Sequence, residues 1–137
     1  ELRMNNRIPP FALIVEEAHN FAREKERSET AVARSVLEKI AREGRKFGAA
    51  LCLISQRPAN LSTTALSQCN THIIMRVTNP NDLKYIEAGA EGIDSRTIRS
   101  ITSLNTGEMI MVGCAVNYPT FVQVRNRKSK KVEKGRP

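Results

Sequence analysis

Two adjacent carboxylates, Glu16 and Glu17, directly follow the apolar run Phe11–Val15 (FALIV). An unbroken apolar run predicts a strand covered on both faces, as in a parallel sheet. Ligands of open α/β sheets bind outside the carboxyl ends of the strands, where these acids are expected to lie. Two carboxylates at that place are costly unless a cation or a reaction uses them. One acid can hold the water shell of a Mg²⁺ ion while the other orients a water for attack on a γ-phosphate.

A second group of polar residues, Ser-Gln-Arg-Pro at 55–58, follows the apolar run at residues 49–54. The neutral amide of Gln56 can bond an attacking water and a phosphate oxygen without adding charge. Gln56 is therefore a suitable γ-phosphate sensor if its strand lies beside the strand that precedes Glu17. The alternative is a polar turn closed by Pro58, which these four residues taken alone favour.

Basic residues gather at the end of a predicted helix, in the segment AREGRKFG at residues 41–48. A guanidinium group forks onto phosphate oxygens and stabilises transferred charge, so Arg42 and Arg45 are both candidates for an arginine finger. The alternative is structural, because cations stabilise the C-terminal end of a helix and Glu38 and Arg42 have the i,i+4 spacing of an ion pair. The sequence does not choose between the two arginines.

The rest of the pattern predicts the elements that hold these residues in place. Apolar runs at 11–15, 49–54 and 71–77 predict strands, and residues 107–112 and 120–124 predict a final strand pair. Helices are expected at residues 30–47, 80–87 and 95–101, with Thr30, Asn79 and Asp94 as N-caps and Gly48 as the stop of the first. Apolar strands separated by helices predict an α/β layer fold with a mainly parallel sheet.

The positive charge of the chain is concentrated at its C-terminal end. The formal net charge is +8, and residues 125–137 hold seven basic residues and one acid. Residues 1–124 are nearly balanced, with 15 basic and 13 acidic residues. The pattern predicts a body at 1–124 and a basic tail at 125–137. The tail is either a solvated segment or one that contacts phosphates or a neighbouring subunit.

Several classes of protein do not fit the composition. No apolar run approaches the roughly 18 residues of a membrane-spanning helix, and the N-terminal residues lack a signal pattern, so a cytoplasmic protein without a membrane partner is expected. The three cysteines, Cys52, Cys69 and Cys114, are widely spaced and predict neither a disulfide framework nor a zinc site. His19 and His72 have no ligand-spaced partner, so a structural role is predicted for both.

Four blocks taken together resemble the C-terminal half of the HerA–FtsK class of ring ATPases, and most nearly its archaeal HerA-type DNA translocases, also called bipolar DNA helicases. The blocks are FALIVEEAHNF, AREGRKFGAALCLISQRP, NTHIIMRVTNPNDLKYIE and TGEMIMVG. The resemblance covers roughly residues 8–126. It implies part of a RecA-like P-loop NTPase core with three layers. It also implies a hexameric ring that pumps double-stranded DNA with ATP and Mg²⁺ and works with a NurA-type nuclease on DNA ends.

The resemblance also implies roles for individual residues. Glu16 and Glu17 match the Walker B acids, with Glu16 holding Mg²⁺ through a water and Glu17 acting in catalysis. Gln56 matches the phosphate sensor, and Arg42 and Arg45 match the region of the arginine finger. One departure concerns Glu16, because the broader pattern usually has Asp there. The assignment of Glu16 to Mg²⁺ is therefore less direct than the assignment of Glu17 to catalysis.

The phosphate-binding loop GxxxxGK[ST] is absent from these residues, and none of the seven glycines is followed by Lys. We therefore expect the chain to be the C-terminal part of a longer ATPase, inactive by itself. A conjugation or secretion ATPase of the same class is a related alternative. A non-catalytic, basic-tailed module that binds DNA or a partner ATPase is another. A GxxxxGK[ST] segment encoded in frame upstream would favour the motor.

Overall fold

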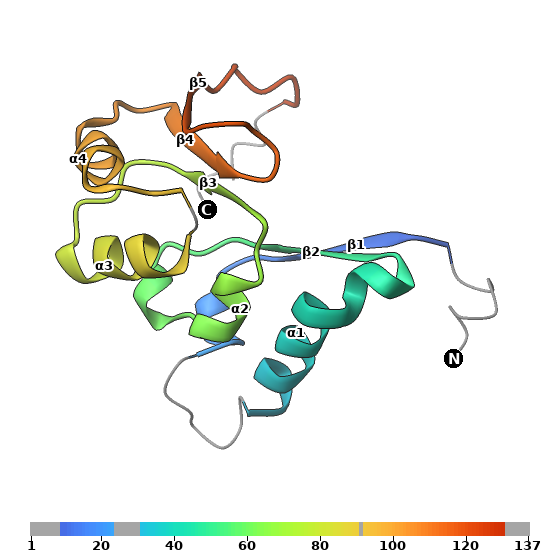
Figure 1. The fold of residues 1–137 in the computed structure, drawn as a ribbon. Coiled ribbons are helices and arrows are strands. Elements are labelled where there is room, and N and C mark those ends of the chain that lie inside the picture. Colours follow the sequence, from blue (N-terminus) through green and yellow to red (C-terminus); the bar gives the residue numbers. More distant parts are fainter. Residues whose placement is uncertain (1–8, 24–30, 91, 131–137) are drawn as a thin grey trace, which may run out of the picture.

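The computed structural model describes residues 9–23, 31–90 and 92–130, which form two small sheets with helices packed on them (Figure 1). The strands are β1 (Phe11–Val15), β2 (Ala49–Leu53), β3 (Thr71–Ile74), β4 (Glu108–Gly113) and β5 (Thr120–Gln123). The helices are α1 (Ala31–Glu43), α2 (Thr63–Ser67), α3 (Pro80–Gly89) and α4 (Ser95–Ser103). Short 3-10 turns are η1 (Ala18–Asn20), η2 (Gly44–Phe47) and η3 (Pro58–Asn60). All five predicted strands and the three predicted helices are confirmed, whereas the predicted cap Thr30 lies outside the described residues.

Strands β1 and β2 form a parallel pair, in register from Phe11 opposite Ala49 to Val15 opposite Leu53. One face of this pair packs against α1 and the turns that follow the strands, through a cluster of buried residues: Ala18, Ala22, Leu37 and Leu61. On the other face Ile14 is 62% exposed. The prediction that the first strand is covered on both faces is therefore wrong for the described residues, because the helix that packs on the pair lies on one side.

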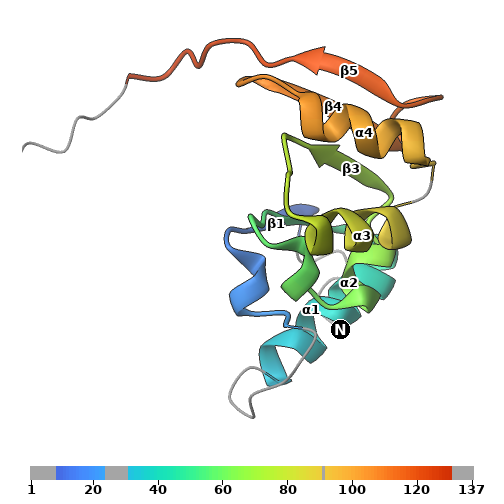
Figure 2. The same ribbon diagram turned by 90° about the vertical axis from the view of Figure 1, so that its left-hand side faces the viewer.

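Strands β3, β4 and β5 form a separate antiparallel sheet in that order. Helices α3 and α4 cover one face of it (Figures 1 and 2). The core between them consists of Ile74, Ile86, Ala90, Ile101, Leu104, Ile110 and Val112. The predicted α/β class is confirmed, with one difference. The parallel pairing holds for β1 and β2, whereas β4 and β5 are joined by too short a connection for a crossover and pair antiparallel.

The helix boundaries follow from local chemistry. The side chain of Asn79 accepts the N–H of Asn81 at 2.9 Å, with Pro80 at the first helical position of α3. Asp94 accepts the N–H of Thr97 at 2.8 Å, and this bond holds the pKa of the Asp94 carboxyl below its ordinary value. The predicted helix at 30–47 continues beyond α1 as the tighter turn η2, which ends at Gly48. Gly48 has φ 67°, a left-handed conformation in which glycine carries no steric cost.

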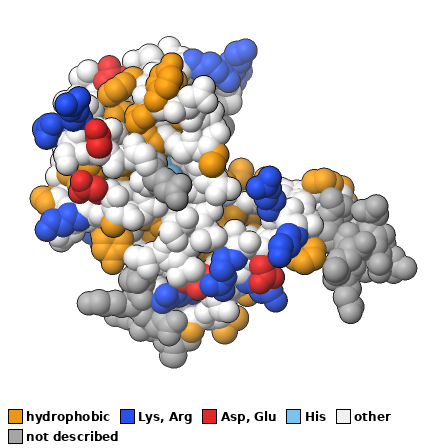
Figure 3. Space-filling model, viewed as in Figure 1, with side chains coloured by type: hydrophobic (Ala, Val, Ile, Leu, Met, Phe, Trp, Pro, Cys, Tyr) orange, Lys and Arg blue, Asp and Glu red, His pale blue; other side chains and the backbone are white. Residues whose placement is uncertain are grey.

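The surface shows no single charged zone on the face seen in Figure 3, where basic and acidic side chains alternate over the elements. Residues 125–130 are exposed and have no regular structure. No helix in the described part of the chain is long and apolar enough to cross a membrane. The three cysteines are free thiols.

Candidate active site

The carboxyl ends of β1 and β2 lie at the same edge of the parallel pair. Their register places Val15 opposite Leu53, and backbone bonds extend the pairing one step further. The N–H of Ile54 donates to the carbonyl of Val15 at 2.9 Å, and the N–H of Ala18 donates to the carbonyl of Ile54 at 2.9 Å. The condition for a role of Gln56 in the site, that its strand lies beside the first, is therefore met.

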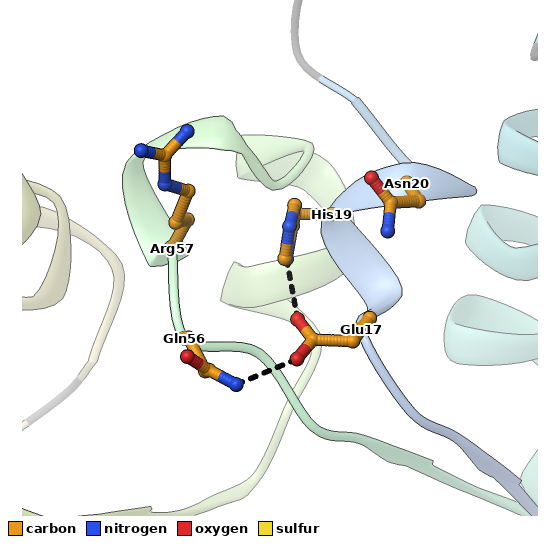
Figure 4. A pocket seen from close by; sticks show the side chains of 5 residues that line it. All are labelled: Glu17, His19, Asn20, Gln56 and Arg57. Carbon is orange, nitrogen blue, oxygen red and sulfur yellow. Dashed lines mark hydrogen bonds and ion pairs between the residues drawn. The ribbon is translucent and has the colours of Figure 1, made fainter.

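The backbone of Glu17 turns sharply as the chain leaves β1. Glu17 has φ 49° and ψ 43°, and it is the one non-glycine residue with positive φ in the described part of the chain. A left-handed conformation costs a residue with a Cβ about 1–2 kcal/mol. The N–H of Asn20 donates to the carbonyl of Glu17 at 2.8 Å and closes the turn. The turn directs the carboxylate toward the end of β2 (Figure 4).

Both carboxylate oxygens of Glu17 have a partner. Gln56 Nε2 donates to Glu17 Oε1 at 2.7 Å, and His19 Nδ1 lies 3.3 Å from Glu17 Oε2 (Figure 4). The same ring nitrogen lies 3.0 Å from Ser55 Oγ. The structure thus brings Glu17 and Gln56 together, and it adds His19, for which the sequence predicted a structural role.

These side chains line an open pocket of about 390 Å³. Its lining consists of Glu17, His19, Asn20, Gln56 and Arg57. Every lining side chain is polar or charged, as suits a phosphate group rather than an apolar ligand. Sequence reasoning gave Asn20 and Arg57 no part in a site. Their position could have predicted a place in the site, since each follows the end of a strand that the apolar runs predict.

Glu16 is exposed, and its side chain makes no hydrogen bond or ion pair with the part of the chain that the structure describes. Within those residues no three His, Cys, Asp or Glu side chains gather into a group that could hold a metal. Mg²⁺ is usually held by one or two carboxylates together with substrate phosphates and waters. Glu17 lines the pocket, where such a shared site would lie, whereas Glu16 does not line it, and the two acids do not form a metal cage by themselves.

Arg42 and Arg45 lie at the opposite end of the parallel pair. Arg45 belongs to η2, which is separated from the first residue of β2 by Gly48 alone, and both arginines are exposed. Five strand residues at about 3.3 Å each separate the two ends by roughly 16 Å. Neither arginine lines the pocket. The structure therefore does not bring them together with Glu17 and Gln56 in the same copy of the chain.

Glu38, on α1, connects this helix to the segment that follows η3. Its Oε1 accepts a bond from Arg34 Nε at 2.7 Å and a short bond from the hydroxyl of Ser62. These bonds, that of Arg34 first, hold the pKa of the Glu38 carboxyl below its ordinary value, and the charge of Arg42 lowers it further. Arg42 lies four residues after Glu38, on the same side of α1.

The fold is shared with solved ATPases. The genome-packaging NTPase B204 of Sulfolobus turreted icosahedral virus 2, solved with ATPγS, superposes with a TM-score of 0.71 at 17% identity, over 89% of this chain and 56% of the viral chain. The complex of the same NTPase with AMP gives a TM-score of 0.70. The described residues therefore share the fold of a part of this NTPase chain.

The sequence has nearer relatives. It is 44% identical over 115 residues to the probable DNA double-strand break repair helicase HerA of Methanocaldococcus jannaschii, covering 84% of this chain and 22% of that protein. It is 42% identical over 119 residues to the HerA helicase of Pyrococcus furiosus, covering 87% and 21%. The chain thus spans about a fifth of the length of these relatives. No protein-family model matches the chain. In sequence, the chain therefore matches one segment of the HerA helicases, at 32–44% identity.

Proposed function

We propose that these residues form the C-terminal part of the ATPase domain of a DNA helicase or translocase that acts on DNA ends. The observation that carries this proposal is the 2.7 Å contact between Glu17 and Gln56 at the shared edge of two parallel strands. A carboxylate and a neutral amide at that edge can act on the same water and the same phosphate.

Each side chain then has a separate task. Glu17 holds the attacking water and takes its proton, acting as the general base. Gln56 donates its amide to the water or to a phosphate oxygen, which requires it to leave Glu17 Oε1. Glu16 would accept a hydrogen bond from a water of the shell of a bound Mg²⁺ ion. Mg²⁺ and ATP, when bound, supply the phosphoryl group that is transferred and the neutralisation of its charge.

An arginine finger in this protein would have to act between subunits. The distance between the two ends of the parallel pair keeps Arg42 and Arg45 away from the pocket of their own copy. A ring of identical subunits, here a homohexamer, would place this end against the pocket of a neighbour. Both arginines are exposed at this end, so each remains a candidate for the finger.

The proposed substrate rests on the names of the relatives and on the tail, and the proposed partner rests on the family resemblance. The HerA proteins of Pyrococcus furiosus and Saccharolobus solfataricus are named DNA double-strand break repair helicases. We propose that the present protein likewise moves along double-stranded DNA and works with a NurA-type nuclease. The basic tail, residues 125–137, is compatible with phosphate contacts at moderate salt.

The test is ATP turnover by the full-length protein. Glu17→Gln removes the general base, and kcat is expected to fall by about 10²- to 10⁴-fold. Glu87→Gln is the matched control, because Glu87 is exposed on α3, away from the pocket. Wild-type turnover in Glu17→Gln would overturn the proposal.

Two further measurements test its scope. Duplex DNA is expected to stimulate ATP turnover at low salt, and the absence of stimulation would favour a secretion-type ATPase. The 137-residue chain by itself is expected neither to bind ATP tightly nor to hydrolyse it. Mg²⁺-dependent turnover by the isolated chain that Glu17→Gln abolishes would contradict that expectation.

A further inference from the structure

The Glu17 carboxylate is held more firmly than its exposure suggests. Its side chain is 44% exposed, and a glutamate with that freedom ordinarily samples many rotamers. Here both oxygens are engaged, Oε1 by Gln56 and Oε2 by His19. Together with the left-handed backbone of Glu17, these two contacts define the direction of the carboxylate.

The contact of Glu17 with Gln56 is expected to break during the reaction, whereas its contact with His19 is expected to persist. Gln56 is exposed, and its proposed task on a phosphate takes its amide away from Glu17. The His19 side chain is only 12% exposed and lies between the turn that follows β1 and the loop that carries Gln56 and Arg57 (Figure 4). His19 therefore remains the contact that holds Glu17 when Gln56 moves to a ligand.

Ser55 fixes the ring of His19. Ser55 Oγ lies 3.0 Å from His19 Nδ1 and accepts the N–H of Arg57 at 3.0 Å. A carboxylate is an acceptor only, so the proposed contact uses the form of the ring that carries a hydrogen on Nδ1, which lies 3.3 Å from Glu17 Oε2. In that form the ring donates to Ser55 Oγ, and the serine is itself anchored by the N–H of Arg57 in the backbone that follows β2.

We propose that His19, braced by Ser55, is a positioning residue that aims the Glu17 carboxylate at the attacking water. This inference rests on the proposed ATPase function. In it His19 touches neither the nucleotide nor the water, and it takes no proton from either. Its contribution is to keep Glu17 in one orientation through the step in which Gln56 changes partner.

Three substitutions of His19 in the full-length protein test this role. His19→Asn leaves an amide nitrogen near the place of Nδ1, whereas His19→Gln extends its amide toward the place of Nε2. His19→Ala and His19→Gln are expected to lower kcat by about 10- to 100-fold, since a misplaced catalytic group costs that much. His19→Asn is expected to stay within about threefold of wild type, because the donor to Glu17 is kept.

The proposal also predicts what does not change. The KM for ATP and the Kd of a non-hydrolysable ATP analogue are expected to match wild type in all three variants, because His19 acts on Glu17 and not on the nucleotide. Ser55→Ala is expected to lower kcat less than His19→Ala, and the double variant no further than His19→Ala alone. Ser67→Ala is the matched control, an exposed serine on α2.

The outcomes separate this inference from the function on which it rests. If the wild-type protein does not hydrolyse ATP, or Glu17→Gln does not lower turnover, the proposed function is wrong. If Glu17→Gln is inactive and His19→Ala keeps the wild-type kcat, only the role of His19 is wrong. Failure of His19→Asn to restore kcat, or a weakened Kd in His19→Ala, would also overturn it, since either result indicates a merely structural residue.

Discussion

The parallel pair and the antiparallel sheet have different roles, since one holds the pocket and the other holds the larger core. The antiparallel sheet buries large aliphatic side chains under α3 and α4, with Ile101 and Ile110 fully inaccessible. The parallel pair buries a smaller cluster in which two of the four residues are alanines. The polar residues that follow the carboxyl ends of its two strands line the pocket. The region with the chemistry therefore has the weaker core, and the region with the stronger core has no part in the site.

The same contrast appears in the backbone. The turn at Glu17 stores strain, and strained residues persist where the surrounding structure holds them. Positive φ in the antiparallel half occurs at glycines such as Gly107 and Gly113, where it costs little. Backbone strain thus occurs at the site, at Glu17, and not in the antiparallel half that stabilises the fold.

The largest effect is expected from a truncation in the strong core. Ile110→Ala should lower the free energy of unfolding by about 2–5 kcal/mol, because Ile110 is fully buried between β4 and the helices. Ile14→Ala is the matched change in the parallel pair, at a side chain that is 62% exposed, and should cost less than about 1 kcal/mol. Urea unfolding of both variants measures the difference. Equal losses of unfolding free energy in the two variants would contradict the difference between the two cores and show that the outer face of β1 is covered.

A smaller effect is expected where the two regions meet. Asp82, nearly buried at the start of α3, accepts the N–H of Ala59 in η3 at 2.9 Å. Asp82→Ala leaves that donor without its acceptor and should cost about 1–3 kcal/mol. Asp82→Asn keeps an acceptor oxygen and should cost less than half as much. A loss in Asp82→Asn as large as that in Asp82→Ala would show that the hydrogen bond does not join the regions.

The site was more predictable from sequence than the packing around it. Glu17 and Gln56 were expected at one edge because each follows an apolar run and parallel strands end together. His19 was missed because its contact depends on a left-handed turn at Glu17, and glutamate, unlike glycine, does not signal one. The direction of β3 was also hidden, since an apolar run of four or more residues does not reveal which neighbour it pairs with.

A still smaller effect, of opposite sign, is expected from removing the strain at Glu17. Glu17→Gly should raise the free energy of unfolding by about 0.5–1 kcal/mol, because glycine adopts φ 49° without steric cost. Gly48→Ala is the opposite change and serves as the control. It should lower the free energy of unfolding by about 1 kcal/mol, because Gly48 has φ 67°. Thermal unfolding measures both. A destabilised Glu17→Gly would mean that the contacts of its carboxylate outweigh the strain of its backbone.

The smallest effect is expected at Glu38 and depends on pH. Hydrogen bonds from Arg34 and Ser62 hold its pKa below the ordinary 4.5 in the folded protein. Above pH 4.5 the carboxylate is charged in both states and its stabilisation is complete. As the pH falls below that value the unfolded chain takes up the proton first, so the free energy of unfolding declines until the folded group is protonated as well.

The measurement is the difference in unfolding free energy between wild type and Glu38→Gln across this range. The difference should narrow as the pH falls, because wild type alone loses the stabilisation that depends on a charged carboxylate. Glu87→Gln, at an exposed position without an ion pair in the described residues, serves as the control and should follow the wild-type acid profile. Parallel curves for wild type and Glu38→Gln would show that Arg34 and Ser62 hold Glu38 equally well without its charge. The contact between α1 and the segment after η3 would then depend on packing and neutral hydrogen bonds. The charge of Glu38 would add nothing to the free energy of unfolding of the parallel region.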